Sequence, residues 1–304
     1  MSTKQDDATV SRIPWKVSFI PYYMDAKLHW NSPDSGDAIK ALFRERFDAV
    51  EWMLGYHFNT PKDLKALAVK TRKAGLEISN IMCWQDLVTT DRKANSLRVM
   101  TLESYVSLAG ELSIPVVNVF TGPMSWADNF LRIGRDISEE QAWSVVVDSF
   151  SKIVEAAERN DVIVTVEAVF GMLVHDYYTM RELLDHFESK NLAVNLDPSH
   201  LVLYGNDPSW AVSRLGSRIK HVHVKDAVGR AGLLGEDFVF PFLGEGAVDW
   251  GAFFNALRKI GYTGYLSLEF ENDVYLNNVC DGDWTIAARE SKTRLMKLLK
   301  KSIL

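Results

Sequence analysis

The sequence predicts an α/β fold of the (β/α)₈ type, a TIM barrel formed as a single domain over residues 1–304. Two observations predict it. Eight short apolar runs alternate with eight longer amphipathic segments, and no Gly/Ser linker, low-complexity tract or charge block interrupts this alternation. The hydrophobic fraction of 47% is sufficient for a large buried core. Such a barrel needs about 250 residues, which leaves room for modest insertions.

Strands and helices are expected in strict alternation along the chain. Each expected strand is a short run rich in Val, Ile, Leu or aromatic residues, whereas each helical segment repeats its apolar residues every three or four positions. In chain order, the expected strands with their following helices are 16–20 and 38–46, 49–53 and 62–73, 77–82 and 95–112, 116–121 and 139–158, 162–167 and 180–188, 193–197 and 209–215, 219–225 and 250–259, and 265–270 and 286–300.

Local signals at the helix ends support these boundaries. Ser138 with Gln141 has the form of a capping box, and Asp249 stands where an N-cap residue belongs. A glycine follows each of three helical patterns, as at many helix C-termini: Gly75, Gly216 and Gly261.

The order of the elements favours closure into a barrel. Strands separated by helices pair in parallel, and eight such units usually close on themselves. A doubly wound open sheet would instead want a glycine-rich phosphate-binding turn after the first strand. That place reads PYYM at 21–24, so the open sheet is the weaker interpretation.

Composition favours a small-molecule partner over nucleic acid or a membrane. The chain has 40 acidic and 34 basic residues, a formal balance of −6, whereas nucleic-acid binding normally needs a basic face. Two cysteines, Cys83 and Cys280, do not make a disulfide framework. Residues 1–12 contain no apolar signal core, and no run approaches about 18 apolar residues. We therefore expect a cytoplasmic protein whose residues 1–14 form a flexible extension ahead of the barrel.

The last four expected strands each carry an ionisable residue near the C-terminal end. Alternate residues of a strand share a face, so the valines and leucines of these strands occupy one face and four polar residues the other. These four are Glu167, Asp197, His223 and Glu269. Because the apolar face must lie under the helices, we expect the four to point into the barrel at its C-terminal end, where barrel enzymes keep their active sites.

Such a cluster predicts one bound divalent metal ion. Crowded carboxylates repel each other and lose hydration, and a cation removes both costs. Three oxygen donors and one imidazole suit Mn²⁺, which we expect first, or Mg²⁺ or Co²⁺; zinc more often recruits further His or Cys ligands. Each residue alone has an ordinary alternative: a Glu paired with Lys225, an Asp that starts a turn before Pro198, or a core histidine. Their coincidence on four successive strands favours the metal site.

Five segments in the second half of the chain carry recognisable motifs. They are VTVE at 164–167, NLDPSH at 195–200, HVHVKD at 221–226, GEGAVDW at 244–250 and GYLSLE at 264–269. Through them the chain resembles the xylose-isomerase-like TIM barrel superfamily of sugar isomerases and epimerases, also described as the sugar phosphate isomerase/epimerase family. The likeness is clear over residues 160–271 and only architectural before them. The motifs are specific for the superfamily and not for one substrate.

The resemblance implies roles for individual residues. It implies that Glu167, Asp197, His223 and Glu269 ligate the metal, that Glu167 and Glu269 also act as acid and base, and that His200 contacts substrate oxygens. A metal that bridges a carbonyl and a neighbouring hydroxyl acidifies the adjacent C–H and stabilises the enediolate that forms. Return of a proton to the same carbon is epimerisation, and return to the neighbouring carbon interconverts aldose and ketose. We expect an isomerase or epimerase acting on a sugar or sugar-derived substrate.

Three further residues are expected to bind substrate. Lys225 is in phase with His223 and could polarise an oxygen or neutralise a carboxylate. Glu51 ends the second strand, where it could orient substrate or form a salt bridge inside the barrel. Phe240 belongs to the long aromatic segment 232–240, which we expect to line the pocket and to favour a bulky or cyclic substrate.

Other functions stay open at this point. The same site could expel a leaving group from the β-carbon of an enolate, as a metal-dependent lyase or dehydratase on a keto sugar, keto-glycoside or cyclic polyol. Some barrels of the superfamily are three-zinc nucleases for abasic sites, but these need an Asp-x-His where this chain has Phe238 and Phe240. A non-catalytic accessory subunit and a homo-oligomer are further alternatives.

Overall fold

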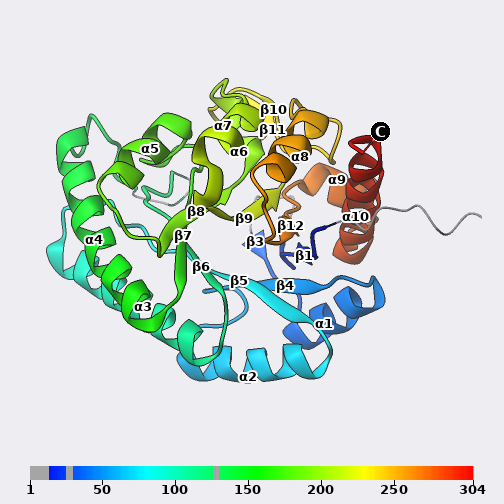
Figure 1. Ribbon diagram of the computed structural model, residues 1–304, viewed down its shortest axis with the longest axis horizontal. Coiled ribbons are helices and arrows are strands. Elements are labelled where there is room, and N and C mark those ends of the chain that lie inside the picture. Colours follow the sequence, from blue (N-terminus) through cyan, green and yellow to red (C-terminus); the bar gives the residue numbers. More distant parts are fainter. Residues whose placement is uncertain (1–13, 25–29, 126, 128–129, 304) are drawn as a thin grey trace, which may run out of the picture.

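A computed structural model of the protein describes residues 14–24, 30–125, 127 and 130–303. Within these residues, eight parallel strands form a closed barrel in the order β1-β12-β9-β8-β7-β6-β5-β4 (Figure 1). The barrel strands are β1 (Val17–Phe19), β4 (Ala49–Met53), β5 (Glu77–Cys83), β6 (Val116–Val119), β7 (Ile163–Glu167), β8 (Leu192–Leu196), β9 (Ile219–Val224) and β12 (Leu266–Leu268). The predicted single-domain TIM barrel is confirmed.

Helices surround this barrel on its outer side (Figure 1). The helices that follow the strands are α1 (Ser35–Arg44), α2 (Pro61–Lys73), α3 (Arg92–Glu111), α4 (Glu139–Asn160), α5 (Tyr177–Asp185), α7 (Pro208–Leu215), α8 (Trp250–Lys259) and α10 (Trp284–Lys301). Every helix predicted from the sequence corresponds to one of these. The predicted extension over residues 1–14 lies, except for Pro14, outside the described residues.

Short elements that the sequence pattern did not predict follow the C-terminal ends of barrel strands, apart from one 3₁₀ turn that precedes β9. Two antiparallel ribbons are formed by β2 (Tyr23–Met24) with β3 (Trp30–Asn31), and by β10 (Val228–Gly229) with β11 (Phe238–Val239). The extra helical segments are α6 (Pro198–Leu203), α9 (Asp273–Asn278) and a 3₁₀ turn at Gly216–Arg218. All of them are too short for an apolar period to reveal.

The predicted helix ends are found with their expected caps. Ser138 and Gln141 form a capping box at α4, and the Asp249 side chain accepts from the Ala252 amide at α8. Gly216 caps α7 with φ of 55°, a left-handed conformation that glycine adopts without strain. Helix α3 begins three residues earlier than predicted because Asp91 caps it there.

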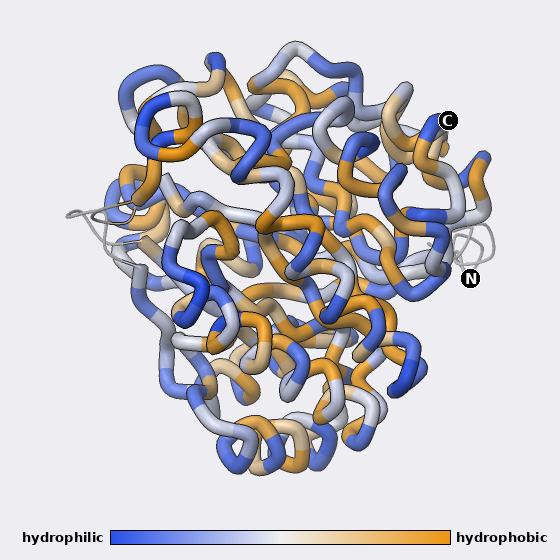
Figure 2. The backbone as a smooth tube through the Cα atoms, turned by 90° about the vertical axis from the view of Figure 1, so that its left-hand side faces the viewer, coloured by the Kyte–Doolittle hydropathy of each residue, from blue (hydrophilic) through white to orange (hydrophobic). Residues whose placement is uncertain are grey.

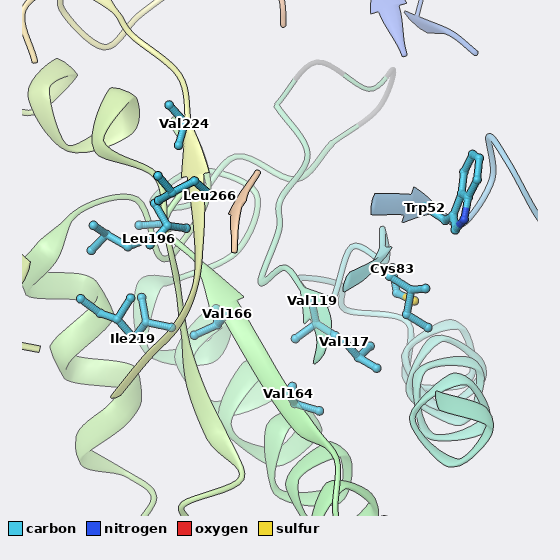
Figure 3. Close-up of a cluster of buried hydrophobic side chains, with 14 of the residues drawn as sticks. Trp52, Cys83, Val117, Val119, Val164, Val166, Leu196, Ile219, Val224 and Leu266 are labelled. Carbon is cyan, nitrogen blue, oxygen red and sulfur yellow. The ribbon is translucent and has the colours of Figure 1, made fainter. Parts of the chain in front are cut away.

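The core lies between the barrel and the helices. The apolar faces of the strands, for example Val164 and Val166 of β7 and Leu196 of β8, point outward into this layer (Figure 3). Hydrophobic and hydrophilic residues alternate along the peripheral helical turns (Figure 2), as expected of helices with one buried face. Within the described residues, none of the helices is both long enough and apolar enough to cross a lipid bilayer.

The inside of the barrel is polar. Buried residues that point into it come from successive strands and include Ser18, Glu51, Ser79, Asn80, Asn118, Thr165, Asn195, His221, His223 and Ser267. Because buried polar groups are costly unless they find partners, this interior is a hydrogen-bonded network, as in the 2.7 Å contact between the Ser18 and Ser79 hydroxyls. The network lies beneath the candidate active site and fixes its floor.

Candidate active site

The four ligands expected from the sequence converge at the C-terminal end of neighbouring strands. Glu167 is the last residue of β7, Asp197 follows β8, His223 lies in β9 and Glu269 follows β12. One ligand atom of each lies within 4.8 Å of the other three, and all four side chains are buried. These residues, called the quartet below, meet because β7, β8, β9 and β12 are adjacent in the barrel.

The quartet fits a divalent cation. Asp197 Oδ2 and Glu269 Oε2 are buried, and their contacts at 3.0–3.2 Å with Lys225 and, for Glu269, His223 are ion pairs that lack good hydrogen-bond geometry. Buried carboxylate oxygens in that condition carry a desolvation cost that a cation would remove. Three carboxylates with one imidazole are also the donor set that hard or borderline divalent ions take.

Lys225 supplies positive charge beside the quartet. Its Nζ lies 3.2 Å from Asp197 Oδ2, 3.0 Å from Glu269 Oε2 and 2.7 Å from Glu271 Oε2. Burial alone would lower the pKa of Lys225, but the surrounding carboxylates, Asp197 first, raise it well above its usual value. Lys225 is therefore a buried ammonium that neutralises part of the carboxylate charge.

Two residues of the site were missed in the sequence. Glu271 lies two residues after Glu269, and the spacing of two was the signal that could have found it. Tyr22, beyond β1, donates hydrogen bonds to Glu269 Oε1 and, at 2.8 Å, to Glu271 Oε1. Burial, and next the charge of Glu269, raise the pKa of Tyr22 well above its usual value, so its hydroxyl stays a donor.

The two expected acid–base residues have different surroundings. Oε2 of Glu167 accepts 2.9 Å hydrogen bonds from the amides of Asn118 and Asn195, and burial raises the pKa of Glu167 to about 7 against the opposing effect of His223. Burial would also raise the pKa of Glu269, but Lys225 and then His223 outweigh it and hold that pKa well below its usual value. Glu269 therefore favours the charged carboxylate form more strongly than Glu167 does.

His223 connects the quartet with the barrel interior. Its Nδ1 lies 3.1 Å from Glu167 Oε1 and 3.1 Å from Glu269 Oε2, and its Nε2 lies 3.1 Å from Glu51 Oε1. Burial lowers the pKa of His223, but the carboxylates, Glu167 first, raise it well above its usual value. An acidic partner on one ring nitrogen is a common way to orient a histidine whose other nitrogen faces a metal.

Glu51 lies beneath the quartet and outside the lining of the cavity. It is completely buried and accepts hydrogen bonds from Asn80 (2.7 Å), His221 (2.9 Å) and Ser267 (2.8 Å) in addition to its contact with His223. Burial raises the pKa of Glu51, but His223 and His221 outweigh it and lower the value far below its usual range. Of the two roles considered for Glu51, this position corresponds to the ion pair inside the barrel.

His200 lies in the short helix α6, in the connection between residues 197 and 209 where the sequence predicted neither helix nor strand. The segment is helical because Asp197 caps it at the Ser199 amide and Pro198 occupies its first turn. His200 Nε2 lies 3.5 Å from Asp197 Oδ2 and 3.4 Å from Lys225 Nζ. Burial, and next the charge of Lys225, lower the pKa of His200 to about 3, so the ring is neutral and borders the cavity.

The expectation for segment 232–240 needs a correction. Gly232, Leu233, Leu234 and Glu236 line the cavity, but Phe240 does not. Phe240 is 2% exposed because it packs behind the site, with its ring centroid 4.5 Å from Lys225 Nζ and 5.7 Å from the His200 ring. Phe240 therefore packs against Lys225 and His200 on the side of these residues that faces away from the cavity.

A cavity of about 950 Å³ adjoins the quartet at the barrel mouth. Glu167, His200, Lys225, Glu269 and Glu271 reach its surface. Asp197 and His223 lie beneath that surface. The cavity gives a ligand access to the carboxylates and the ammonium group together, and its volume lies at the upper end of the range of about 300–1,000 Å³ for small-molecule sites.

Known proteins of related sequence include sugar-type enzymes. The chain is 24% identical over 155 residues to the inosose dehydratase of Geobacillus thermodenitrificans, a match that covers 47% of this chain and only about half, 52%, of that protein. It is 22% identical over 283 residues to the inosose dehydratase of Clostridium perfringens strain ATCC 13124, covering 87% of this chain and 94% of that protein.

Solved structures of similar fold cover nearly the whole chain. The structure of L-ribulose 3-epimerase superposes with a TM-score of 0.70 at 18% identity, covering 95% of each chain. The IOLI protein with a bound zinc atom superposes with a TM-score of 0.72 at 18% identity, covering 94% of this chain and 99% of the other.

Membership of a family follows from a match over most of the sequence. The family model described as xylose isomerase-like TIM barrel matches residues 39–298, which include every residue of the quartet. The chain belongs to the xylose isomerase-like TIM barrel family, in which sugar epimerases and inosose dehydratases are found, and carries a buried candidate site for a divalent metal.

Proposed function

We propose that the protein is a divalent-metal-dependent isomerase or epimerase that moves a proton next to the carbonyl group of a sugar or sugar-derived substrate. The observation that carries the proposal is the buried quartet of Glu167, Asp197, His223 and Glu269 on the floor of a large cavity. Membership of a family with sugar epimerases and the structural likeness to L-ribulose 3-epimerase support it.

Glu167 and Glu269 are the proposed proton carriers. Glu167 ends β7 and Glu269 follows β12, with β8 and β9 between these strands, so the two side chains approach a bound substrate from two sides. Each is held by one oxygen, Glu167 by the amides of Asn118 and Asn195 and Glu269 by the Tyr22 hydroxyl. The second oxygen of each remains directed to the quartet, where one carboxylate can remove a proton and the other return it.

The remaining chemistry depends on the cation and on two donors. When bound, a divalent cation would polarise the carbonyl group and stabilise the negative charge that develops on its oxygen. Lys225 and His200 border the cavity and can donate hydrogen bonds to substrate oxygens. Mn²⁺ is the first ion to test, followed by Mg²⁺, Co²⁺ and Zn²⁺, the last because zinc occupies the IOLI structure.

Dehydration or another elimination is the second candidate, favoured by the sequence likeness to two inosose dehydratases. The proton is removed from the carbon next to the carbonyl, and a hydroxyl or alkoxyl leaves the next carbon with a proton from a donor. The products are an unsaturated ketone and water or an alcohol. Lys225, whose ammonium group lies on the cavity surface, is the donor for the leaving group.

Solvent isotope exchange distinguishes these outcomes. Purified protein is loaded with each metal and incubated with a panel of keto sugars and keto-glycosides in deuterated water. Deuterium next to the carbonyl without loss of a group supports the isomerase or epimerase, and release of water or an alcohol selects the elimination. Protein that binds metal but neither exchanges deuterium nor releases a group contradicts both.

Two variants test the proton carriers. Glu167→Gln and Glu269→Gln should bind metal more weakly and lower turnover by roughly 10²–10⁴-fold, because each removes a ligand and a proton carrier together. Glu188→Gln is the matched control, since the same chemical change falls on an exposed residue. Full activity in either quartet variant would refute the assignment.

A further inference from the structure

The charged residues that line the cavity all lie on one side of the barrel mouth, where apolar residues such as Phe170 and Leu234 line it as well. The quartet comes from β7, β8, β9 and β12, which are consecutive in the barrel. Strands β4, β5 and β6 contribute apolar side chains at the corresponding level. Met53 ends β4, Met82 lies near the end of β5, and Phe120 follows β6. Residues Met53, Met82, Trp84, Phe120 and Met124 all line the cavity and are called the apolar wall below.

The apolar wall is a packed surface of its own. Met53, Met82 and Phe120 are 2%, 1% and 1% exposed and belong to a hydrophobic cluster separate from the main core. Trp84 stacks on Phe120 with ring centroids 4.1 Å apart and an interplanar angle of 12°. The wall is thus built before any ligand arrives, so a ligand does not have to order it.

This wall is poorly matched to a free sugar. Hydroxyl groups against thioether and aromatic side chains would lose hydrogen bonds to water without gaining partners. The polar groups of the lining near this wall are the hydroxyls of Tyr22, Tyr56 and Ser125 and the indole N–H groups of Trp30 and Trp84. A cavity of about 950 Å³ also offers space beyond that which a polar ring over the quartet would use.

We propose that the substrate is a sugar or polyol ring that carries an aromatic substituent, with the ring over the quartet and the substituent against the apolar wall. The position of the ring rests on the proposed function; the place of the substituent rests on the wall. An aromatic group is favoured because methionine sulfur and aromatic faces both bind flat rings well, and methionine adapts to their shape.

A pair of unreactive probes tests this substrate class without requiring turnover. Methyl β-D-glucoside and phenyl β-D-glucoside differ only in the substituent, and calorimetry on the Mn²⁺-loaded protein gives both affinities. Burial of the phenyl group should make phenyl β-D-glucoside bind roughly 10- to 100-fold more tightly. Equal affinities, or no binding of either probe, would overturn the proposal.

Variants then place the aromatic group. Met124→Gln and Met82→Gln keep an unbranched side chain but put an amide in the wall, and each should reduce the preference for the phenyl probe by several-fold. Met100→Gln makes the same change at a 61% exposed site on α3 and should leave the preference unchanged. Met124 is only partly buried, so its variant remains informative even if the buried Met82→Gln fails to fold. A preference that both folded wall variants retain would overturn the proposal.

The two proposals fail in different experiments. If no deuterium is exchanged but the preference for the phenyl probe depends on the apolar wall, the proposed reaction is rejected and the aromatic site is supported. Exchange that is present with equal affinities for both probes supports the reaction and overturns the substrate class inferred here.

Discussion

Asp226 offers a sharp test of how the barrel mouth is held together. Its buried carboxylate accepts five hydrogen bonds from the chain that follows β9. Oδ1 accepts from the backbone amides of Ala227 (3.0 Å) and Val248 (3.1 Å). Oδ2 accepts from the backbone amides of Gly244 (2.9 Å) and Gly246 (3.2 Å) and from the Trp250 indole (2.9 Å). One side chain therefore fixes the segment GEGAVDW beside Lys225 and His223.

Asp226→Asn should destabilise the protein strongly although it changes one atom. An amide has one acceptor oxygen, so in its better orientation it keeps the three donors at Oδ2 and turns its NH₂ toward Ala227 and Val248. Two buried donors are then unsatisfied, at about 1–3 kcal/mol each, which predicts a loss of about 2–6 kcal/mol. At about 2 °C per kcal/mol for a chain of this size, Tm should fall by about 4–12 °C.

The assay is thermal and urea unfolding of the metal-free protein, with Asp249→Asn as the matched control. Asp249 undergoes the same chemical change, but it caps α8 through a single bond to the Ala252 amide, and Asn caps helices as well as Asp does. The control should stay within about 0.5 kcal/mol of the wild type. If Asp226→Asn loses less than about 1 kcal/mol, the reasoning from unsatisfied buried donors is refuted.

Three further outcomes are expected. Burial lowers the pKa of His57 to about 4, below its ordinary value of 6.5, so the unfolded chain binds a proton that the folded protein excludes. The free energy of unfolding should therefore fall by up to about 3 kcal/mol as the pH decreases from about 6.5 to about 4. Urea titrations of His57→Asn should show a flatter dependence on pH. Lys225→Met breaks a buried ion-pair cluster and should lower the free energy of unfolding of the metal-free protein by about 3–5 kcal/mol. The rise in Tm on adding Mn²⁺ should then be larger than in the wild type. An unchanged rise speaks against a cation site beside the Lys225 ammonium group. Gly246→Ala would put a Cβ 2.1 Å from Asp226 Oδ1 and should lower Tm. The control Gly251→Ala, whose Cβ has its nearest contact at 3.4 Å, should leave Tm unchanged. Equal Tm values for the two variants would show that the turn at Gly246 shifts without cost.

The barrel and the convergence of the quartet follow from two sequence periods: apolar residues at every third or fourth position in the helices, and at every second position in the strands. Alternation along β7 separates Val166 from Glu167, and the same alternation in β9 separates Val224 from His223. Once the order of strands and helices predicts closure, these faces have only one arrangement, apolar toward the helices and polar inward. The quartet could therefore be expected before any coordinates were known.

Depth within the barrel could not be predicted in the same way. Glu51 faces the barrel interior as Glu167 does, but it lies in the middle of its strand (49–53) and beneath the cavity, whereas Glu167 ends its strand. The pairing of β4 with β5 shifts register between Val50 and Glu51, and β8 with β9 shifts between Val194 and Asn195. A period of two shows which face a residue occupies but not how far along the barrel axis it lies, because such shifts depend on packing between strands.

The apolar wall escaped prediction for a related reason. Met82 and Phe120 are residue types that ordinarily belong to a core, and nothing in their local sequence separates a side chain packed under a helix from one that faces a cavity. Barrel closure makes that distinction, since it places the ends of β5 and β6 across the mouth from the quartet. The residues that carry the reaction can thus be predicted from the sequence, because ionisable residues are rare at strand ends. Specificity is encoded in common apolar ones, and only the three-dimensional arrangement shows which of them a substrate can reach.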